Sequence, residues 1–66
     1  MNLMIRNNTN IPLDDIGYMI ENLPKLEEYL DEQLEYESDN GVKEALIVSH
    51  IKHEDYDEWI FRRAAS

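Results

Sequence analysis

The hydrophobic pattern opens with a short apolar run, Leu3-Met4-Ile5. The next residues, 7–10, are Asn-Asn-Thr-Asn, and these residue types favour turns. An apolar run that ends at a cluster of turn residues is typical of a strand. We therefore expect a first strand over residues 1–7.

After this turn the apolar positions recur at intervals of three and four residues, which is the spacing of one helical face. They are Leu13, Ile16, Met19, Ile20 and Leu23. Pro12 suits the first helical turn, and Asp14 and Asp15 suit the positive end of the helix dipole. The pattern predicts a helix over residues 12–22.

Pro24 interrupts the helical pattern because it lacks an amide donor and biases Leu23 away from helical geometry. The apolar spacing then resumes at Leu26, Tyr29, Leu30 and Leu34. We expect a second helix over residues 24–37 that meets the first at a bend. A single helix kinked at Pro24 is the alternative. Residues 38–41, Ser-Asp-Asn-Gly, form a strong stop and turn signal.

The last third of the chain has the composition of a β-hairpin. Residues 45–52 are β-branched and hydrophobic, residues 54–57 are polar, and residues 58–62 read as the returning strand. The whole pattern predicts an α+β fold in one small domain, residues 1–66, with the order β-α-α-β-β. A three-stranded antiparallel sheet would be covered on one face by two short helices or by one kinked helix.

We expect the helices to pack on the hairpin through an apolar core. Its predicted members are Ile16, Ile20, Leu26, Leu30, Leu34, Ile47, Ile51, Trp59 and Phe61. Such a core is marginal but sufficient, because each buried apolar side chain contributes about 1.5–3 kcal/mol. Sixty-six residues are close to the lower limit for folding without disulfides, metals or a partner chain. A homodimer would ease this limit.

Net charge narrows the function classes. Fifteen acidic and six basic residues give a formal charge of −9. We expect no direct binding to nucleic acid or to an anionic membrane surface, because both would repel the chain. There is no cysteine, and no apolar run approaches the roughly 20 residues of a membrane span. The expectation is a folded protein of the cytoplasm.

The acidic residues concentrate in the central segment, where Lys25 is the only basic residue among seven carboxylates. These are Glu27, Glu28, Asp31, Glu32, Glu35, Glu37 and Asp39. On a helix, each pair of like charges at i,i+4 lowers the stability of the helix by roughly 0.2–0.5 kcal/mol. Acidic residues kept at this cost suggest a surface that binds a basic partner. The five carboxylates from Glu27 to Glu35 would span about 12 Å of helix, and duplex DNA carries about seven charges over that length. The segment therefore predicts a DNA-like anionic surface.

We therefore predict a non-enzymatic inhibitor or modulator that occludes the basic, nucleic-acid-binding surface of a target protein. Short, acidic, cysteine-free chains are typical of phages and mobile elements, and this analogy places the protein in a host cell. The predicted contact residues are Glu27, Glu28, Asp31, Glu32, Glu35, Tyr36, Asp55, Tyr56 and Asp57. The alternative is an acidic interaction module, either an antitoxin- or immunity-type partner or a structural subunit, that docks through its hairpin aromatics. A face that only aids solubility is the third interpretation.

The remaining chemistry-bearing residues indicate no reaction. His50 and His53, three apart on a strand, would point to opposite faces, so we expect no metal site. A calcium loop that begins at Glu35 would need Gly at its sixth position, where the chain has Asn40. No nucleophile motif or Gly-rich phosphate loop is present, so we expect no catalytic residues and no cofactor.

The aromatic and basic residues near the C-terminus complete these predictions. Trp59 is expected in the core, and Tyr36 and Tyr56 are expected to be exposed. Arg62 and Arg63 are expected to be solvated or paired with Glu58.

Overall fold

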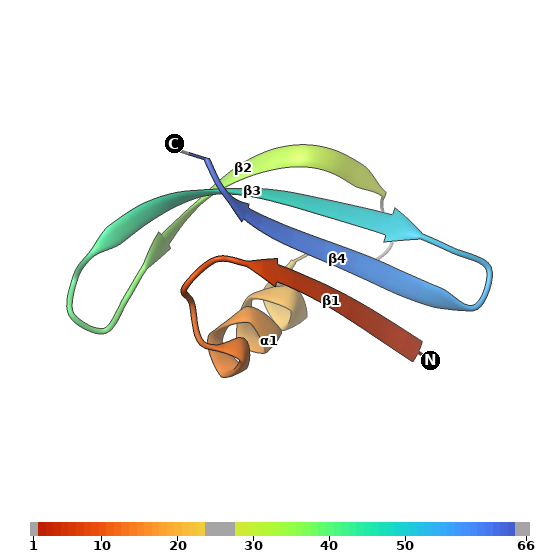
Figure 1. The fold of residues 1–66 in the computed structure, drawn as a ribbon, viewed down its shortest axis with the longest axis horizontal. Helices are drawn as coiled ribbons and strands as arrows, with labels where there is room; N and C mark the ends of the chain where they lie inside the picture. Colours follow the sequence, from red (N-terminus) through yellow and green to blue (C-terminus); the bar gives the residue numbers. More distant parts are fainter. Residues whose placement is uncertain (1, 24–27, 65–66) are drawn as a thin grey trace.

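The protein was analysed as a computed structural model, which describes residues 2–23 and 28–64. The elements are β1 (Asn2–Asn8), α1 (Leu13–Asn22), β2 (Tyr29–Glu37), β3 (Lys43–Lys52) and β4 (Tyr56–Arg63). Figure 1 shows one twisted sheet with the helix on one side of it. The predicted α+β class is confirmed, as are the first strand, the first helix and the C-terminal hairpin.

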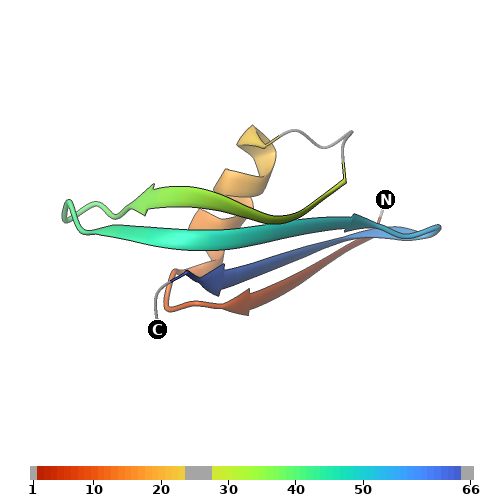
Figure 2. The same ribbon diagram turned by 90° about the horizontal axis from the view of Figure 1, so that it is seen from above.

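The four strands lie in the order β1-β4-β3-β2. β3 pairs antiparallel with both β2 and β4, whereas β1 pairs parallel with β4. Figure 2 shows that α1 crosses beneath the sheet and extends past β2, while no element of the described chain covers the opposite face. We call this uncovered side the open face. The prediction of three antiparallel strands was wrong, because the sheet has a fourth strand and one parallel pair.

Local chemistry explains where α1 begins and ends. The carbonyl of Pro12 accepts hydrogen bonds from the amides of Asp15 and Ile16, at 3.0 and 3.1 Å. Asp14 and Asp15 lie in the first turn, where the helix dipole favours negative charge. Leu23 has extended backbone angles, as expected for the residue before a proline.

The predicted second helix was wrong, because Tyr29–Glu37 is the edge strand β2. Leu34 and Tyr36 are half-buried and alternate with exposed Gln33, Glu35 and Glu37, which is the period of a strand. Residues i and i+4 are about 13 Å apart on a strand, against about 6 Å on a helix. The strand therefore separates the i,i+4 pairs, although Glu35 and Glu37, which share one face, lie only about 7 Å apart. Residues 24–27 of the predicted helix lie outside the described residues.

A β-bulge interrupts the start of β2. Tyr29 pairs with His50 and Glu32 with Val48, so three residue steps on β2 match two on β3. Asp31 within the bulge has a φ of 55°, a left-handed conformation that Asp tolerates better than most residues. The bulge places Asp31 on the open face.

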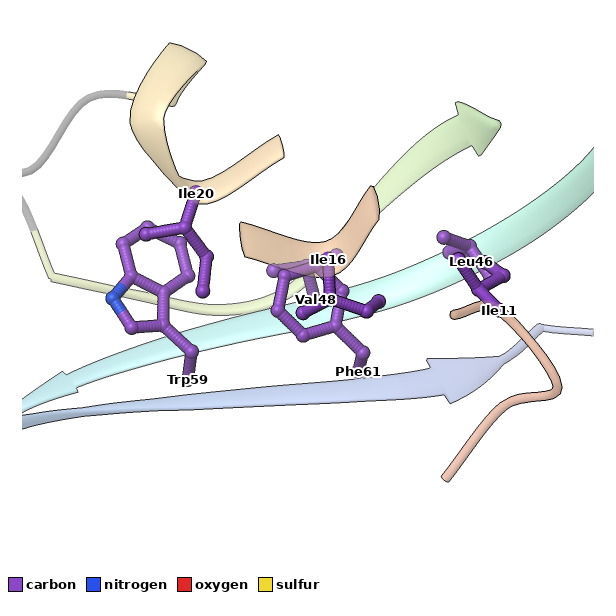
Figure 3. Packing of buried hydrophobic residues seen from close by; sticks show 7 residues of the cluster. All are labelled: Ile11, Ile16, Ile20, Leu46, Val48, Trp59 and Phe61. Carbon is purple, nitrogen blue, oxygen red and sulfur yellow. The ribbon is translucent and has the colours of Figure 1, made fainter. Parts of the chain in front are cut away.

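The core lies between α1 and the inner face of the sheet (Figure 3). Its buried members are Ile11, Ile16, Ile20, Leu46, Val48, Trp59 and Phe61. Figure 3 shows Ile20 pointing toward Trp59 and Ile16 toward Phe61. The core positions of Ile16, Ile20, Trp59 and Phe61 were predicted correctly.

The other predicted core residues lie elsewhere. Ile47 and Ile51 are half-buried on the open face, and Leu30 is 66% exposed. Leu34 only packs against the margin of the core, and Leu26 is outside the described residues. β3 is apolar on both faces, so its own pattern does not choose the inner one. The choice is fixed by the pairing of His50 with Trp59 and of Val48 with Phe61.

We predict that Ile16→Ala lowers the free energy of unfolding by about 2–5 kcal/mol, because it leaves a cavity under the sheet. Ile16→Val should cost about 0.5–1.5 kcal/mol. Leu13→Ala on the same helix should change stability by less than about 0.5 kcal/mol, since Leu13 is 61% exposed. Urea unfolding followed by circular dichroism measures all three. Equal effects at positions 13 and 16 would contradict this packing of α1.

Candidate protein-binding surface

The exposed carboxylates of β2 and its flanking turns form one border of the sheet, which we call the acidic edge. Its members are Glu28, Glu32, Glu35, Glu37 and Asp39. All five residues are exposed, and β2 has β3 as its only strand neighbour in the described sheet. The sequence-predicted Glu27 lies outside the described residues.

The strand geometry changes the charge density assumed for a helix. Glu35 and Glu37 lie opposite Ala45 and Lys43 on the open-face side, whereas Glu32 lies opposite Val48 on the helix side. From Glu32 to Asp39 the strand and turn span at most roughly 23 Å, over which duplex DNA carries about 14 charges. The acidic edge has four carboxylates in this span. A match to the linear charge density of DNA, as predicted for a helix, is therefore wrong.

Negative charge is denser where α1 passes the end of β2. A cleft of about 300 Å³ opens there. Its lining residues are Asp15, Tyr18, Met19, Glu35, Tyr36, Glu37 and Asp39. We call it the acidic cleft. Four of its seven lining residues are acidic, and Tyr18 beside them is 70% exposed.

Tyr36 fixes one wall of the acidic cleft. Its hydroxyl donates a 2.5 Å hydrogen bond to Oδ2 of Asp15, and its ring packs against the core. The hydrogen bond to Asp15, together with burial, raises the pKa of Tyr36 to about 12. The prediction of an exposed Tyr36 was wrong, because the residue is half-buried and joins β2 to α1. Tyr18 is the exposed aromatic residue at this place.

A cluster on the open face holds Arg6. Its Nε donates to Oε2 of Glu58 at 2.7 Å, and Nε2 of His53 lies 2.8 Å from Oε1 of the same carboxylate. The hydrogen bonds from His53 and Arg6 lower the pKa of Glu58. Glu58 was predicted to pair with Arg62 or Arg63, and the structure pairs it with Arg6 instead.

The other two arginines also have carboxylate partners. Arg62 pairs with Asp31, whose Oδ1 also accepts a 3.3 Å hydrogen bond from the hydroxyl of Ser49. Nε of Arg63 lies 3.7 Å from Oε2 of Glu44. Asp31 is thus neutralised within the molecule, which weakens its predicted role as a partner contact.

The hairpin turn is separate from the acidic cleft. Figure 1 places the turn between β3 and β4 and the turn between β2 and β3 at opposite ends of the sheet. Asp55 is exposed, whereas the ring of Tyr56 stacks on His53 at 4.3 Å. Oδ1 of Asp57 lies 3.7 Å from Nε2 of buried His50. The sequence-predicted contact residues therefore divide into two groups, and Tyr56 is half-buried rather than exposed.

Sequence reasoning missed the contribution of α1 to this surface. Asp14 and Asp15 were interpreted only as helix-start residues, and Tyr18 was not considered. Tyr18 lies outside the apolar stripe that includes Ile16, Met19 and Ile20, and this pattern marks it as exposed.

Two searches of the described residues bear on other functions. α1 is the only helix there, and it lacks the length and apolar character needed to cross a membrane. No group of three or more His, Asp or Glu side chains is arranged to hold a metal ion in residues 2–23 and 28–64.

Comparison of the chain with protein-family models, with curated proteins and with solved structures gives no match.

We predict that one of the four tyrosines titrates with a pKa of about 12, and that Tyr36→Phe removes this step. The raised pKa means that the neutral phenol favours the folded state. Its contribution to stability is present below the unfolded pKa of about 10 and is lost as pH rises through about 12. Near-ultraviolet absorbance follows the titration. The control Tyr18→Phe should keep the high step, and its loss there would contradict the assignment.

We also predict that Glu58→Gln flattens the acid limb of the stability curve. The lowered pKa of Glu58 means that its contribution is present above the unfolded value of 4.5 and is lost as pH falls through the folded value. Thermal unfolding from neutral pH down to well below pH 4.5 measures the effect. Glu54→Gln, at an exposed position in the same turn region, should retain the wild-type curve. An unchanged acid limb in Glu58→Gln would refute the importance of this cluster.

Proposed function

We propose that this protein is a small, non-enzymatic inhibitor or modulator that binds a basic surface on a target protein, of the kind that otherwise holds DNA or RNA. The observation that carries the proposal is the acidic cleft, where four acidic residues and an exposed tyrosine line one end of the sheet. A surface of this charge and shape suits Lys and Arg side chains.

The distribution of charge supports binding at this end of the molecule. All three arginines of the chain pair with carboxylates that do not line the cleft, and Glu44, the partner of Arg63, lies opposite Tyr36 of the cleft wall. Glu35, Glu37 and Asp39 are exposed at the cleft, with Lys43 beside Glu37 across the strand pair. Together with a net charge of −9, this arrangement attracts basic partners and accelerates their association.

Tyr18 provides contact area among the charges. It is 70% exposed on α1, and Met19 lies beside it in the lining of the cleft. Aromatic side chains surrounded by polar residues carry much of the binding energy in protein interfaces. An Arg of the target can stack on the Tyr18 ring while it pairs with a neighbouring carboxylate.

Occlusion is the proposed mechanism. Lys and Arg residues that pair with Glu35 and Glu37 are not available to phosphates. The proposal depends on the acidic cleft as a local concentration of charge, because β2 has a lower linear charge density than DNA. A phage or mobile-element origin, with action inside a host cell, remains part of the proposal by analogy with short acidic proteins.

The alternative, docking through the hairpin aromatics, has less support. Trp59 and Phe61 are 1% and 0% exposed, so they offer no contact area while the core is intact. Tyr56 is half-buried against His53. Of the sequence-predicted contact residues at the hairpin, only Asp55 is exposed.

The test is capture of basic proteins from a nuclease-treated lysate of the native host, using the immobilised protein. We predict that the double reversal Glu35→Lys/Glu37→Lys weakens capture of the principal target by tenfold or more, because it inverts the charge of the acidic cleft. Added duplex DNA or RNA should displace the target. Raising the salt concentration should also release it, since exposed charges are screened beyond about 10 Å at 0.1 M salt.

The matched control is Glu54→Lys/Asp55→Lys, which makes the same change in net charge at the other end of the sheet. It should retain most of the capture. Equal losses in both variants would show that net charge alone matters, and loss only in the control would favour the hairpin. A target that nucleic acid does not displace would contradict occlusion.

A further inference from the structure

The two edges of the sheet differ in how they are protected. At β2 the bulge at Asp31 and the row of exposed carboxylates oppose the addition of another strand. Figure 2 also shows α1 extending beyond this edge of the sheet. These are the devices by which natural sheets prevent edge-to-edge pairing.

β1 has none of these devices. Its register with β4 runs without a break from Asn2 opposite Tyr56 to Asn8 opposite Arg62. It contains no proline and one charged residue, Arg6, which Glu58 already holds. β4 is its only strand neighbour in the described sheet, and Figure 2 shows no described element beyond its outer edge. One row of main-chain groups along β1 is therefore open to pairing.

Apolar side chains lie on both faces of this unprotected edge. Leu3 is 53% exposed and Met4 is 39% exposed. They point to opposite faces, since Leu3 shares the helix-covered face with Ile5 and Met4 shares the open face with Arg6. An added strand would cover both of them.

The charge pattern indicates which strand can be added. All fifteen carboxylates lie between Asp14 and Glu58, and residues 1–13 contain none. Two copies of a chain with a charge of −9 repel each other, and this repulsion is reduced at β1, which carries no acidic residue and whose Arg6 pairs with Glu58 of the neighbouring strand. A self-complementary contact about a two-fold axis is also the commonest form of protein association.

We propose that β1 pairs antiparallel with β1 of a second copy, so that two four-stranded sheets form one continuous sheet of eight strands. Pairing centred on Met4 places Leu3 opposite the partner's Ile5 and Arg6 opposite the partner's Asn2. No like charges face each other across this pair. The partner strand also supplies the additional burial that helps a chain of this size. The acidic clefts remain uncovered at the two outer sides of the dimer.

Sedimentation velocity over a range of protein concentrations tests the proposal. The wild-type protein should form dimers as concentration rises, and Leu3→Lys should weaken dimerisation by tenfold or more, because lysine on an edge strand opposes pairing. Leu30→Lys places the same charge on the opposite edge at a side chain that is 66% exposed, and it should dimerise as the wild type does. A wild type that stays monomeric up to about 1 mM would overturn the proposal. Loss of the dimer only in Leu30→Lys would also overturn it.

Disulfide trapping gives a second test that does not depend on adding charge. The chain has no cysteine, so Met4→Cys introduces a single thiol. Antiparallel pairing centred on Met4 brings the two Cα atoms to about 4.5–5.5 Å, within the range of a disulfide. Met4→Cys should therefore form covalent dimers at least tenfold faster than Leu30→Cys under mild oxidation. Equal rates would refute pairing at this edge. Equal rates are the result expected of dimers that stack through the open face, because stacked sheets lie about 10 Å apart.

Discussion

The packing of α1 against Trp59 and Phe61 is the interaction on which the rest of the structure depends. These two side chains select the inner face of β4, and through cross-strand pairing they select the inner face of β3. Ile16 and Ile20 then complete the core from the helix. Because one helix covers one face only, the other face carries the half-buried isoleucines and two arginine–carboxylate pairs.

The same arrangement decides where charge is neutralised and where it is exposed. Arg6 and Arg62 on the open face hold Glu58 and Asp31, which lie on the same side of the sheet. At the far end of β2, Arg63 pairs with Glu44, which lies opposite Tyr36, while α1 brings Asp15 and Tyr18 to the acidic cleft. The protein therefore has a nearly self-compensated open face and a cleft whose described lining holds four acidic residues and no Lys or Arg. The negative charge is therefore distributed unevenly over the surface of the molecule.

Local patterns predicted about half of this structure. The first strand, α1 and the C-terminal hairpin have clear periods and turn signals, and each was found close to its observed bounds. The segment from Tyr29 to Glu37 satisfied the helical spacing through Tyr29, Leu30 and Leu34 as well as the strand alternation around Leu34 and Tyr36. Pairing with β3 decided in favour of the strand, and no residue within the segment could signal this. The acidic cleft could not be predicted from local sequence either, because it depends on contacts between distant parts of the chain. The hydrogen bond from Tyr36 to Asp15, for example, joins residues 21 positions apart.

The parallel pairing of β1 with β4 has a consequence for how the chain folds. β1 can pair with its partner only once β4, which begins at Tyr56 after every other described element, is in place. Until then the apolar side of α1 has only part of its packing surface. The register from Asn2 to Tyr56 closes a loop of more than fifty residues, and the entropy of that closure is lost before the contact forms. We expect completion of the sheet to be a late and comparatively slow event, with the hairpin of β3 and β4 acting as its template.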